Sequence, residues 1–238
     1  LITEARKDIA ALFARFGIKA IQLAESDSKL GGVETHTEAR KCAELFKNHA
    51  DEIDGVLVCL PNFGDEKGVA DTLKLAGLNV PVLIQGYPDD LNKLSPARRR
   101  DAFCGKISVT NNLVQAGIKF TLTSKHVAHP TSASFEKDLQ QFLGVCRVVN
   151  GLRGVRLGAV GARPGAFNTV RYSEKILERH GISVTTVDLS EIIGKATKLD
   201  ANAAAVKTKL AEITGYAPAP GVPRRDRPAR RCRWSALH

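Results

Sequence analysis

Residues 54–86 read DGVLVCLPNFGDEKGVADTLKLAGLNVPVLIQG, and this stretch decides the fold. Residues 54–60 are a short apolar run rich in β-branched side chains, which is typical of a strand buried on both faces. Residues 68–78 place apolar side chains along one face of a helix, and residues 79–86 predict a second strand. A strand, a helix and a strand in this order predict a right-handed βαβ unit with parallel strands.

Two loops of this unit are candidate binding segments. Residues 61–66 follow the first strand and combine turn formers with carboxylates, and residues 85–90 follow the second strand. In open parallel sheets, ligands bind outside the carboxyl ends of the strands. We therefore expect any ligand to meet the protein at these two loops.

The rest of the chain continues the alternation of helices and strands. Strands are expected at residues 18–23, 119–123, 155–161 and 182–187, and helices at residues 1–16, 35–49, 110–116, 134–152, 170–180 and across 189–216. The predicted fold class is α/β, with two consecutive Rossmann-like or flavodoxin-like parallel-sheet βα units, the second incomplete. The expected divisions are an N-terminal domain at 1–152, the beginning of a second α/β domain at 153–216, and a disordered basic tail at 217–238.

Both ends of the chain look unusual. The chain has no methionine and begins in a predicted helix, so the first domain is expected to lack its first strand. Residues 217–238 change composition abruptly and show no periodicity of a folded element. A disordered basic arm and a frameshifted ending both account for this segment.

The net charge of +10 first points to nucleic acid, but its location argues against that partner. The segment 217–238 holds six arginines against one acidic residue, whereas charges of both signs mix along the rest of the chain. The run Arg98-Arg99-Arg100 is interpreted as a solvated helix end rather than an anion site. We expect no nucleic-acid partner.

Composition also indicates where the protein is located and what state its cysteines are in. No window approaches the roughly 18 apolar residues of a membrane span, and no signal peptide is visible, so the sequence predicts a cytoplasmic protein without a membrane partner. The five cysteines form no CxxC pair, which favours reduced thiols and argues against a zinc site. Cys59 and Cys104 are interpreted as small core residues rather than nucleophiles.

The motifs that carry chemistry are weak on their own. Glycines at 158, 161 and 165 with a later acid mimic a dinucleotide fingerprint, but the GxGxxG spacing is absent and Pro164 interrupts the expected helix start. His126 and His129 favour hydrogen bonds within a loop over a metal site. Asp65 and Glu66 are best explained as acids at a helix N-terminus. Other side chains of the glycine loop remain candidates for a polar pocket: Arg163, Asn168 and Thr169.

Three stretches together resemble the L-fucose/L-arabinose isomerase family. They are LVCLPNFGDE at 57–66, DAFCGKISVTNNL at 101–113 and GAVGARPGAFNTVRYSEK at 158–175. The third stretch is the most specific, and the resemblance covers about residues 1–216.

The resemblance implies a metal-dependent aldose–ketose isomerase. Members of that family use a divalent metal, usually manganese, that bridges two sugar oxygens while carboxylates move a proton between C1 and C2 through an enediol. The metal ligands of the family lie in later parts of its chains. We therefore expect Mn²⁺ in the intact parent protein, no catalytic residue or metal ligand in this chain, and no turnover by this chain alone.

The resemblance also implies a half-site. In the oligomers of that family, the N-terminal domain closes the sugar pocket of a neighbouring subunit. Phe63, on a loop with Asn62, is the leading candidate contact, with packing inside its own domain as the alternative; Gln85, Lys106 and Ser108 are further candidate substrate-binding residues. The expected partners are a monosaccharide and further copies of the chain in a homo-oligomer. The alternative function is a non-catalytic sugar- or nucleotide-binding α/β module.

Overall fold

The computed structural model describes residues 1–216, and the chain divides into two compact units. The first unit comprises Leu1–Val155 together with Leu177–Ile182, and the second comprises Arg156–Ile176 and, among the described residues, 183–216. The domain boundary expected between residues 152 and 153 stays a prediction. The tail expected at 217–238 lies outside the described residues.

The first unit is built on a parallel sheet with the strand order β1-β2-β3. β1 (Val56–Leu60) pairs in parallel with β2 (Val82–Gly86), in a register that places Val56 opposite Val82. β2 pairs in parallel with the short β3 (Thr121–Leu122). The predicted α/β class with parallel βα units is confirmed. The strand predicted at residues 18–23 is wrong, because this extended segment pairs with no strand in the described part of the chain.

Five helices accompany this sheet, and local sequence sets several of their ends. They are α1 (Ile2–Arg15), α2 (His36–Asn48), α3 (Glu66–Ala76), α4 (Ala102–Gln115) and α5 (Ala133–Leu152). Thr35 and Glu38 form a reciprocal capping box that begins α2. Asp65 begins α3 by accepting a hydrogen bond from the Gly68 amide at 2.5 Å, which confirms its role at a helix N-terminus.

α4 begins earlier than its sequence predicts. A helix was expected only over residues 110–116, but the observed helix starts at Ala102. The β-branched residues Ile107 and Val109 lower the helix propensity of this segment, so its helical pattern is hard to recognise in the sequence. The buried positions Ala102, Gly105, Val109 and Leu113 nevertheless recur at the helical period, and burial of this face stabilises the helix.

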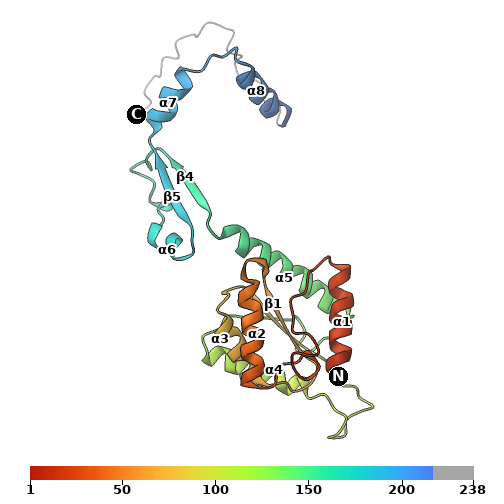
Figure 1. Ribbon diagram of the computed structural model, residues 1–238. Coiled ribbons are helices and arrows are strands. Elements are labelled where there is room, and N and C mark those ends of the chain that lie inside the picture. The colour runs from red at the N-terminus through yellow and green to blue at the C-terminus, as the bar shows by residue number, and fades with distance from the viewer. Residues whose placement is uncertain (217–238) are drawn as a thin grey trace. The chain divides into compact units, whose positions relative to one another are not determined.

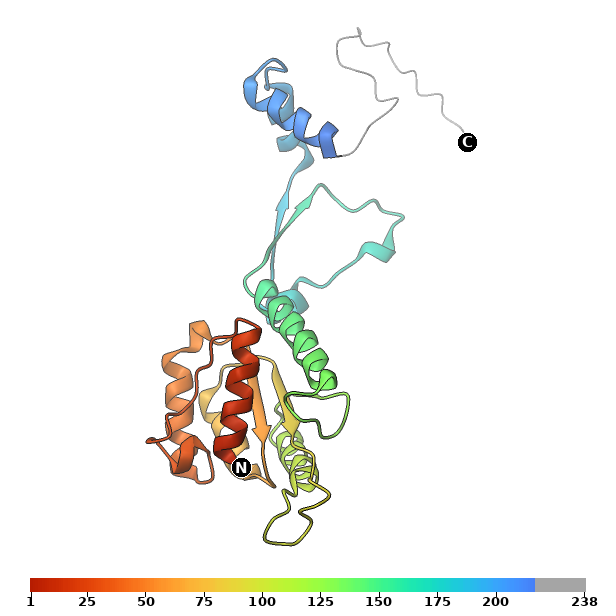
Figure 2. The same ribbon diagram turned by 90° about the vertical axis from the view of Figure 1, so that its right-hand side faces the viewer.

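The core lies on both faces of the sheet, and helices cover each face (Figures 1 and 2). On one face, Leu83 of β2 packs in a cluster with Leu12 of α1 and Phe135 of α5. On the other face, Ile84 packs in a cluster with Ala70 of α3 and Val109 of α4. Successive residues of a strand therefore point to opposite helical layers. This burial on both faces explains why β1 and β2 are apolar runs.

The second unit contains a separate two-stranded sheet. β4 (Arg156–Val160) pairs in parallel with β5 (Ser183–Val187), and the helices of this unit are α7 (Leu189–Thr197) and α8 (Ala204–Tyr216). The short helix α6 (Glu174–Arg179) begins in the second unit and ends in the segment Leu177–Ile182 of the first. None of these described elements contains a buried residue. The helix predicted at residues 170–180 is shorter than expected, because residues 168–170 form a 3-10 turn that ends before α6.

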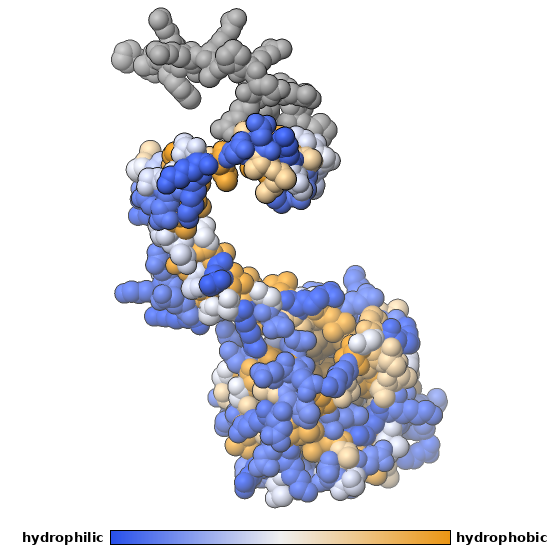
Figure 3. Space-filling view, turned by 45° about the horizontal axis from the view of Figure 1, so that its top comes forward, coloured by the Kyte–Doolittle hydropathy of each residue, from blue (hydrophilic) through white to orange (hydrophobic). Residues whose placement is uncertain are grey.

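Within residues 1–216, no helix is both long enough and apolar enough to cross a membrane. The surface seen in Figure 3 is largely hydrophilic, with smaller apolar areas between charged side chains.

Replacing Leu83 tests the packing of the central strand. Leu83 is 1% exposed, so Leu83→Ala removes buried methyl groups and leaves a cavity that lowers the free energy of unfolding by about 2–5 kcal/mol. Urea denaturation followed by circular dichroism measures this loss. Leu91→Ala is the matched control, because Leu91 is 83% exposed and its truncation is expected to cost less than about 0.5 kcal/mol. Equal effects of the two changes would contradict the assigned core.

Candidate functional site

The carboxyl edge of the first sheet carries a tightly held loop. Residues 61–65 connect β1 to α3, and their backbone presses against Gly105 of α4. A Cβ atom at Gly105 would lie 1.7 Å from the Phe63 carbonyl oxygen, so only glycine permits this approach. The loop leaves Asn62 and Phe63 exposed, and Phe63 retains 42% of its accessible surface. The structure thus holds an exposed aromatic side chain on a fixed backbone.

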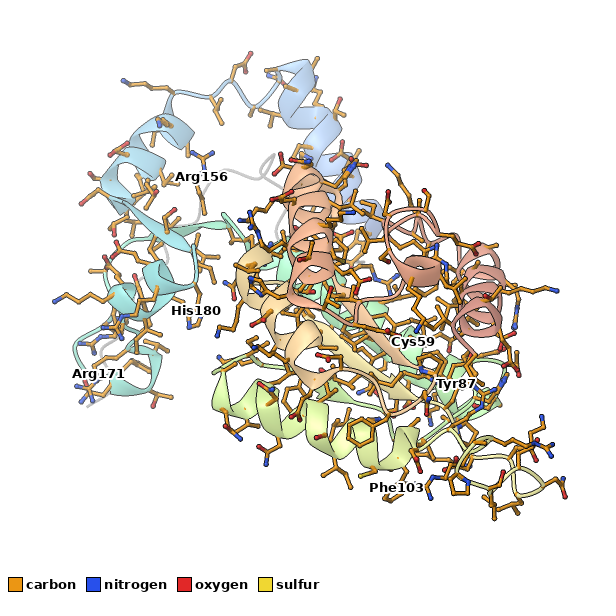
Figure 4. The ribbon with its side chains drawn as sticks, turned by 60° about the horizontal axis from the view of Figure 1, so that its bottom comes forward. Cys59, Tyr87, Phe103, Arg156, Arg171 and His180 are labelled. Atoms are coloured by element: carbon orange, nitrogen blue, oxygen red, sulfur yellow. The ribbon has the colours of Figure 1, made fainter. Side chains whose placement is uncertain are left out.

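A buried tyrosine, Tyr87, also lies at the carboxyl edge of the first sheet. Tyr87 directly follows β2 and lies beside Cys59 of β1 (Figure 4). Its hydroxyl donates a hydrogen bond to Asp8 Oδ2 at 3.0 Å, and its ring meets the His129 ring edge-on at 5.0 Å between centroids. His129 Nε2 lies 3.5 Å from the same Asp8 oxygen. Burial, followed by the neighbouring Cys59 and Asp8, raises the pKa of Tyr87, so its hydroxyl remains a donor.

Arg100 joins this tyrosine to the loop. Its guanidinium lies 4.8 Å from the centre of the Tyr87 ring and donates to the Pro61 carbonyl at 3.1 Å. It also donates to Glu4 Oε2 at 2.7 Å, and this hydrogen bond lowers the pKa of Glu4. The interpretation of residues 98–100 as a solvated helix end is therefore correct only in that Arg98 and Arg99 are exposed to solvent. No helix forms there, and the Arg100 side chain is only 13% exposed because it has partners on three segments.

Gln85 and Lys106 are buried and hold a second loop in place. Gln85 donates from Nε2 to the Ala128 carbonyl at 2.7 Å, while its Oε1 atom has no hydrogen-bond partner within residues 1–216. Lys106 donates from Nζ to Thr123 Oγ1 at 2.6 Å and to the His126 carbonyl at 2.7 Å. Burial lowers the pKa of Lys106 to about 8. These contacts make both residues positioning groups for residues 123–128.

Ser108 faces a shallow groove on the outside of α4. Its hydroxyl donates to Glu66 Oε2 at 2.5 Å. The groove has a volume of about 440 Å³ and is lined by residues that include Glu66, Cys104, Ile107, Ser108 and Asn111. Among the five candidate substrate-binding residues, Asn62, Phe63 and Ser108 therefore reach accessible surface, whereas Gln85 and Lys106 are enclosed.

The two cysteines considered at this edge differ in their environments. Burial raises the pKa of the Cys59 thiol to about 12, which keeps it protonated and agrees with a core role. The assignment of Cys104 to the core is wrong, because Cys104 lies on the exposed side of α4. Since α4 begins earlier than expected, the buried positions of this segment fall on its neighbours Ala102 and Gly105.

His129 makes a hydrogen bond within its loop, as expected, whereas His126 contacts Phe103 of α4. His126 Nε2 lies 2.8 Å from the Phe103 carbonyl oxygen, and His129 Nδ1 lies 2.8 Å from Thr131 Oγ1. Within residues 1–216, no group of three histidine, cysteine, aspartate or glutamate side chains has a geometry that could hold a metal ion. The manganese implied by the resemblance therefore does not fit the described side chains of this chain.

The glycine loop of the second unit lacks the geometry of a dinucleotide site. Gly161 ends β4 with a φ of 74°, and the segment that follows forms a turn and a 3-10 helix rather than the N-terminus of an α-helix. Arg163 donates to the Phe167 carbonyl at 2.7 Å and lies 3.3 Å from Asn168 Oδ1. Its guanidinium thus stabilises its own loop.

The sequence did not reveal the cluster formed by Asp8, Tyr87, Arg100 and His129. The position of Tyr87 directly after a predicted strand is the one available signal, because side chains at that place meet at the sheet edge. The partners of Tyr87 come from segments far apart in the chain, and no local pattern links them.

The buried ammonium of Lys106 should make stability depend on pH. Its folded pKa of about 8 lies below the ordinary value of 10.5, so between these values the unfolded chain binds more protons than the folded chain. The free energy of unfolding of the wild type should therefore rise relative to that of Lys106→Met, by about 1–2 kcal/mol between pH 7 and pH 10. Urea titrations at both pH values measure the change. Lys125→Met, at an exposed lysine, is the control, and a Lys106→Met difference that does not change with pH would contradict a buried charge.

Comparison with known proteins places the first unit in a family. A comparison with curated proteins finds no match. The family model described as "Fucose/sulfoquinovose isomerase, N-terminal domain" matches residues 1–153, which include all three strands of the first sheet and the cluster around Tyr87. This match covers more than half of the chain and agrees with the resemblance to fucose isomerases. The chain therefore belongs to the fucose/sulfoquinovose isomerase family and contains the N-terminal domain of that family.

Proposed function

We propose that this chain is part of a metal-dependent aldose–ketose isomerase. Its first unit forms one wall of the monosaccharide pocket of that enzyme. The observation that carries the proposal is the exposed Phe63 on a loop fixed against Gly105. An aromatic ring can cover the apolar face of a sugar, and the neighbouring Asn62 amide can hydrogen-bond to its hydroxyl groups. The loop also lies at the carboxyl edge of a parallel sheet, where such folds bind ligands.

The electrostatics of this edge favour an uncharged sugar. The Arg100 guanidinium is paired with Glu4, and the Asp8 carboxylate accepts the hydrogen bond of Tyr87 beside His129. Arg100 and Glu4 therefore neutralise each other, and the carboxylates of the Phe63 loop and its neighbour, Asp65 and Glu66, each accept a hydrogen bond within the protein. A polyhydroxylated neutral ligand can bind there without disrupting an ion pair.

The reaction itself is assigned to other residues. Isomerisation of an aldose moves a proton between C1 and C2 through an enediol, which requires positioned acid and base groups. Manganese would polarise the sugar oxygens when bound, but the described side chains hold no group suited to it. We assign the metal ligands and the acid–base carboxylates to residues outside 1–216 and to a neighbouring subunit of a homo-oligomer.

We also infer that the protein is located in the reducing environment of the cytoplasm. The cysteines in the described part of the chain, Cys42, Cys59, Cys104 and Cys146, are all free thiols. Free thiols persist where glutathione and thioredoxin keep cysteines reduced.

Sugar binding by the Phe63 loop can be measured by NMR. Titration of the ¹⁵N-labelled chain with L-fucose should shift the amides of residues 61–66 with a dissociation constant in the millimolar range, because only one wall of the pocket is present. Phe63→Ala should weaken binding by about fivefold, which corresponds to the loss of about 1 kcal/mol of aromatic contact. Phe167→Ala is the matched control, because Phe167 is an exposed phenylalanine of the second unit.

The same titration separates the two candidate functions. Amide shifts at residues 161–168 on addition of NAD, with none at 61–66 on addition of fucose, would favour a nucleotide-binding module and contradict the proposal. Equal losses from Phe63→Ala and Phe167→Ala would show that the Phe63 loop has no special role.

A further inference from the structure

The chain between β2 and α4 forms a long closed loop, whose tip at residues 90–99 is here called the 90–99 loop. No helix or strand lies between these two elements. Asp89 Oδ1 accepts hydrogen bonds from the amides of Arg100 at 2.9 Å and Asp101 at 3.2 Å, so the two ends of the loop meet at its base. A compact surface loop whose ends lie close together is an Ω-loop, and such loops are frequently functional.

The base of this loop is fixed, whereas its tip is not. At the base, Tyr87 is buried and the Arg100 guanidinium donates to the Pro61 carbonyl. Within the part of the chain that the structure describes, the hydrogen bonds and ion pairs of residues 90–99 all stay inside the segment 89–101. The tip can therefore move as a unit without breaking a polar contact to the rest of the first unit.

The tip exposes apolar side chains to water. Residues 91–99 are all exposed, and Leu91 and Leu94 retain 83% and 56% of their accessible surface. In Figures 1 and 2 this loop extends below the rest of the first unit. Apolar side chains gain free energy when they are removed from water, and the position seen here leaves that gain unused.

The loop that holds Phe63 lies within reach of this tip. The Arg100 guanidinium lies 3.1 Å from the carbonyl oxygen of Pro61, so the base of one loop touches the other. Leu94 is six residues from Arg100, and an extended chain of that length spans up to about 20 Å. Phe63 is two residues from Pro61, which is at most about 7 Å. Movement of the tip alone can therefore bring the leucine side chains to the Phe63 ring.

We propose that the 90–99 loop is a lid that closes over a monosaccharide bound at Phe63, with Leu91 and Leu94 as its inner surface. This inference rests on the proposed function of the Phe63 loop. In the closed form the sugar lies between the aromatic ring and the two leucines. Because the sugar joins the two loops, its binding energy shifts the lid from the open to the closed form. Closure removes water from the sugar, as lids of enzymes commonly do.

The charges of the tip are compatible with closure over a neutral sugar. Lys93 Nζ lies 3.1 Å from an Asp90 carboxylate oxygen, and Arg99 Nε lies 2.7 Å from an Asp101 carboxylate oxygen. These pairs lie within the loop and can move with it. Closure therefore does not require an oppositely charged group on the sugar or on the Phe63 loop.

Trypsin cleavage measures closure directly, since Lys93 and Arg98 are exposed cleavage sites within the lid. Cleavage follows the population of the accessible form, so saturating L-fucose should slow cleavage at these sites by at least about threefold in the 238-residue chain. Mass spectrometry of the peptides gives the rates. Cleavage after Arg171, an exposed residue of the second unit, should keep its rate in the same samples and controls for any effect of the sugar on the protease.

Substitution of the two leucines provides the second arm. The double change Leu91→Ser and Leu94→Ser should remove the protection by fucose, while the circular dichroism spectrum stays unchanged because both side chains are exposed. Leu152→Ser makes the same change at a half-exposed leucine at the end of α5 and should keep the protection.

The outcomes separate the lid from the sugar wall. Fucose-dependent amide shifts at residues 61–66 with unchanged cleavage after Lys93 and Arg98 would overturn the lid and leave the sugar wall standing. Absence of both responses would overturn the lid together with the proposed function. Full protection in the double leucine variant would contradict the assignment of Leu91 and Leu94 as the inner surface of a lid.

Discussion

The close approach of the Phe63 backbone to Gly105 is the constraint on which the carboxyl edge depends. A side chain at Gly105 would overlap the Phe63 carbonyl, so the loop can rest on α4 only because this position lacks a Cβ atom. With the loop in that position, the Pro61 carbonyl accepts a hydrogen bond from Arg100. Arg100 in turn contacts Glu4 and the Tyr87 ring. The glycine at position 105 thus permits contacts that join the loop after β1, Tyr87 after β2 and the start of α1.

The polar groups of this edge divide into two kinds. Tyr87, Gln85 and Lys106 are buried, and the hydrogen bonds that they donate fix neighbouring segments. Asn62 and Phe63 are exposed on a backbone that these contacts help to immobilise. Such a division is expected of a binding surface, because exposed groups bind a ligand well only when a second layer of contacts holds them in one geometry. The proposed sugar wall depends on both kinds of residue.

Local patterns in the sequence predicted the sheet well and the edge poorly. The βαβ unit follows from apolar runs that alternate with a helical period, and the place of Asp65 at a helix N-terminus follows from local side-chain chemistry. The start of α4 was missed, because β-branched residues conceal a face whose burial stabilises the helix. The strand expected at residues 18–23 does not form, because this segment pairs with no strand within residues 1–216. The contacts of Arg100 join residues far apart in sequence, so only the folded structure could reveal them.

Gly105→Ala tests the central claim most directly, with Gly144→Ala as its control, because a Cβ at Gly144 of α5 meets no atom within 4 Å. Both variants gain helix propensity, so both should fold. NMR spectra recorded with and without L-fucose are the measurement. The account predicts that Gly105→Ala moves the amides of residues 61–65 and removes their response to the sugar, while Gly144→Ala leaves both unchanged. A Gly105→Ala protein with wild-type amide positions and a wild-type response to fucose would contradict it.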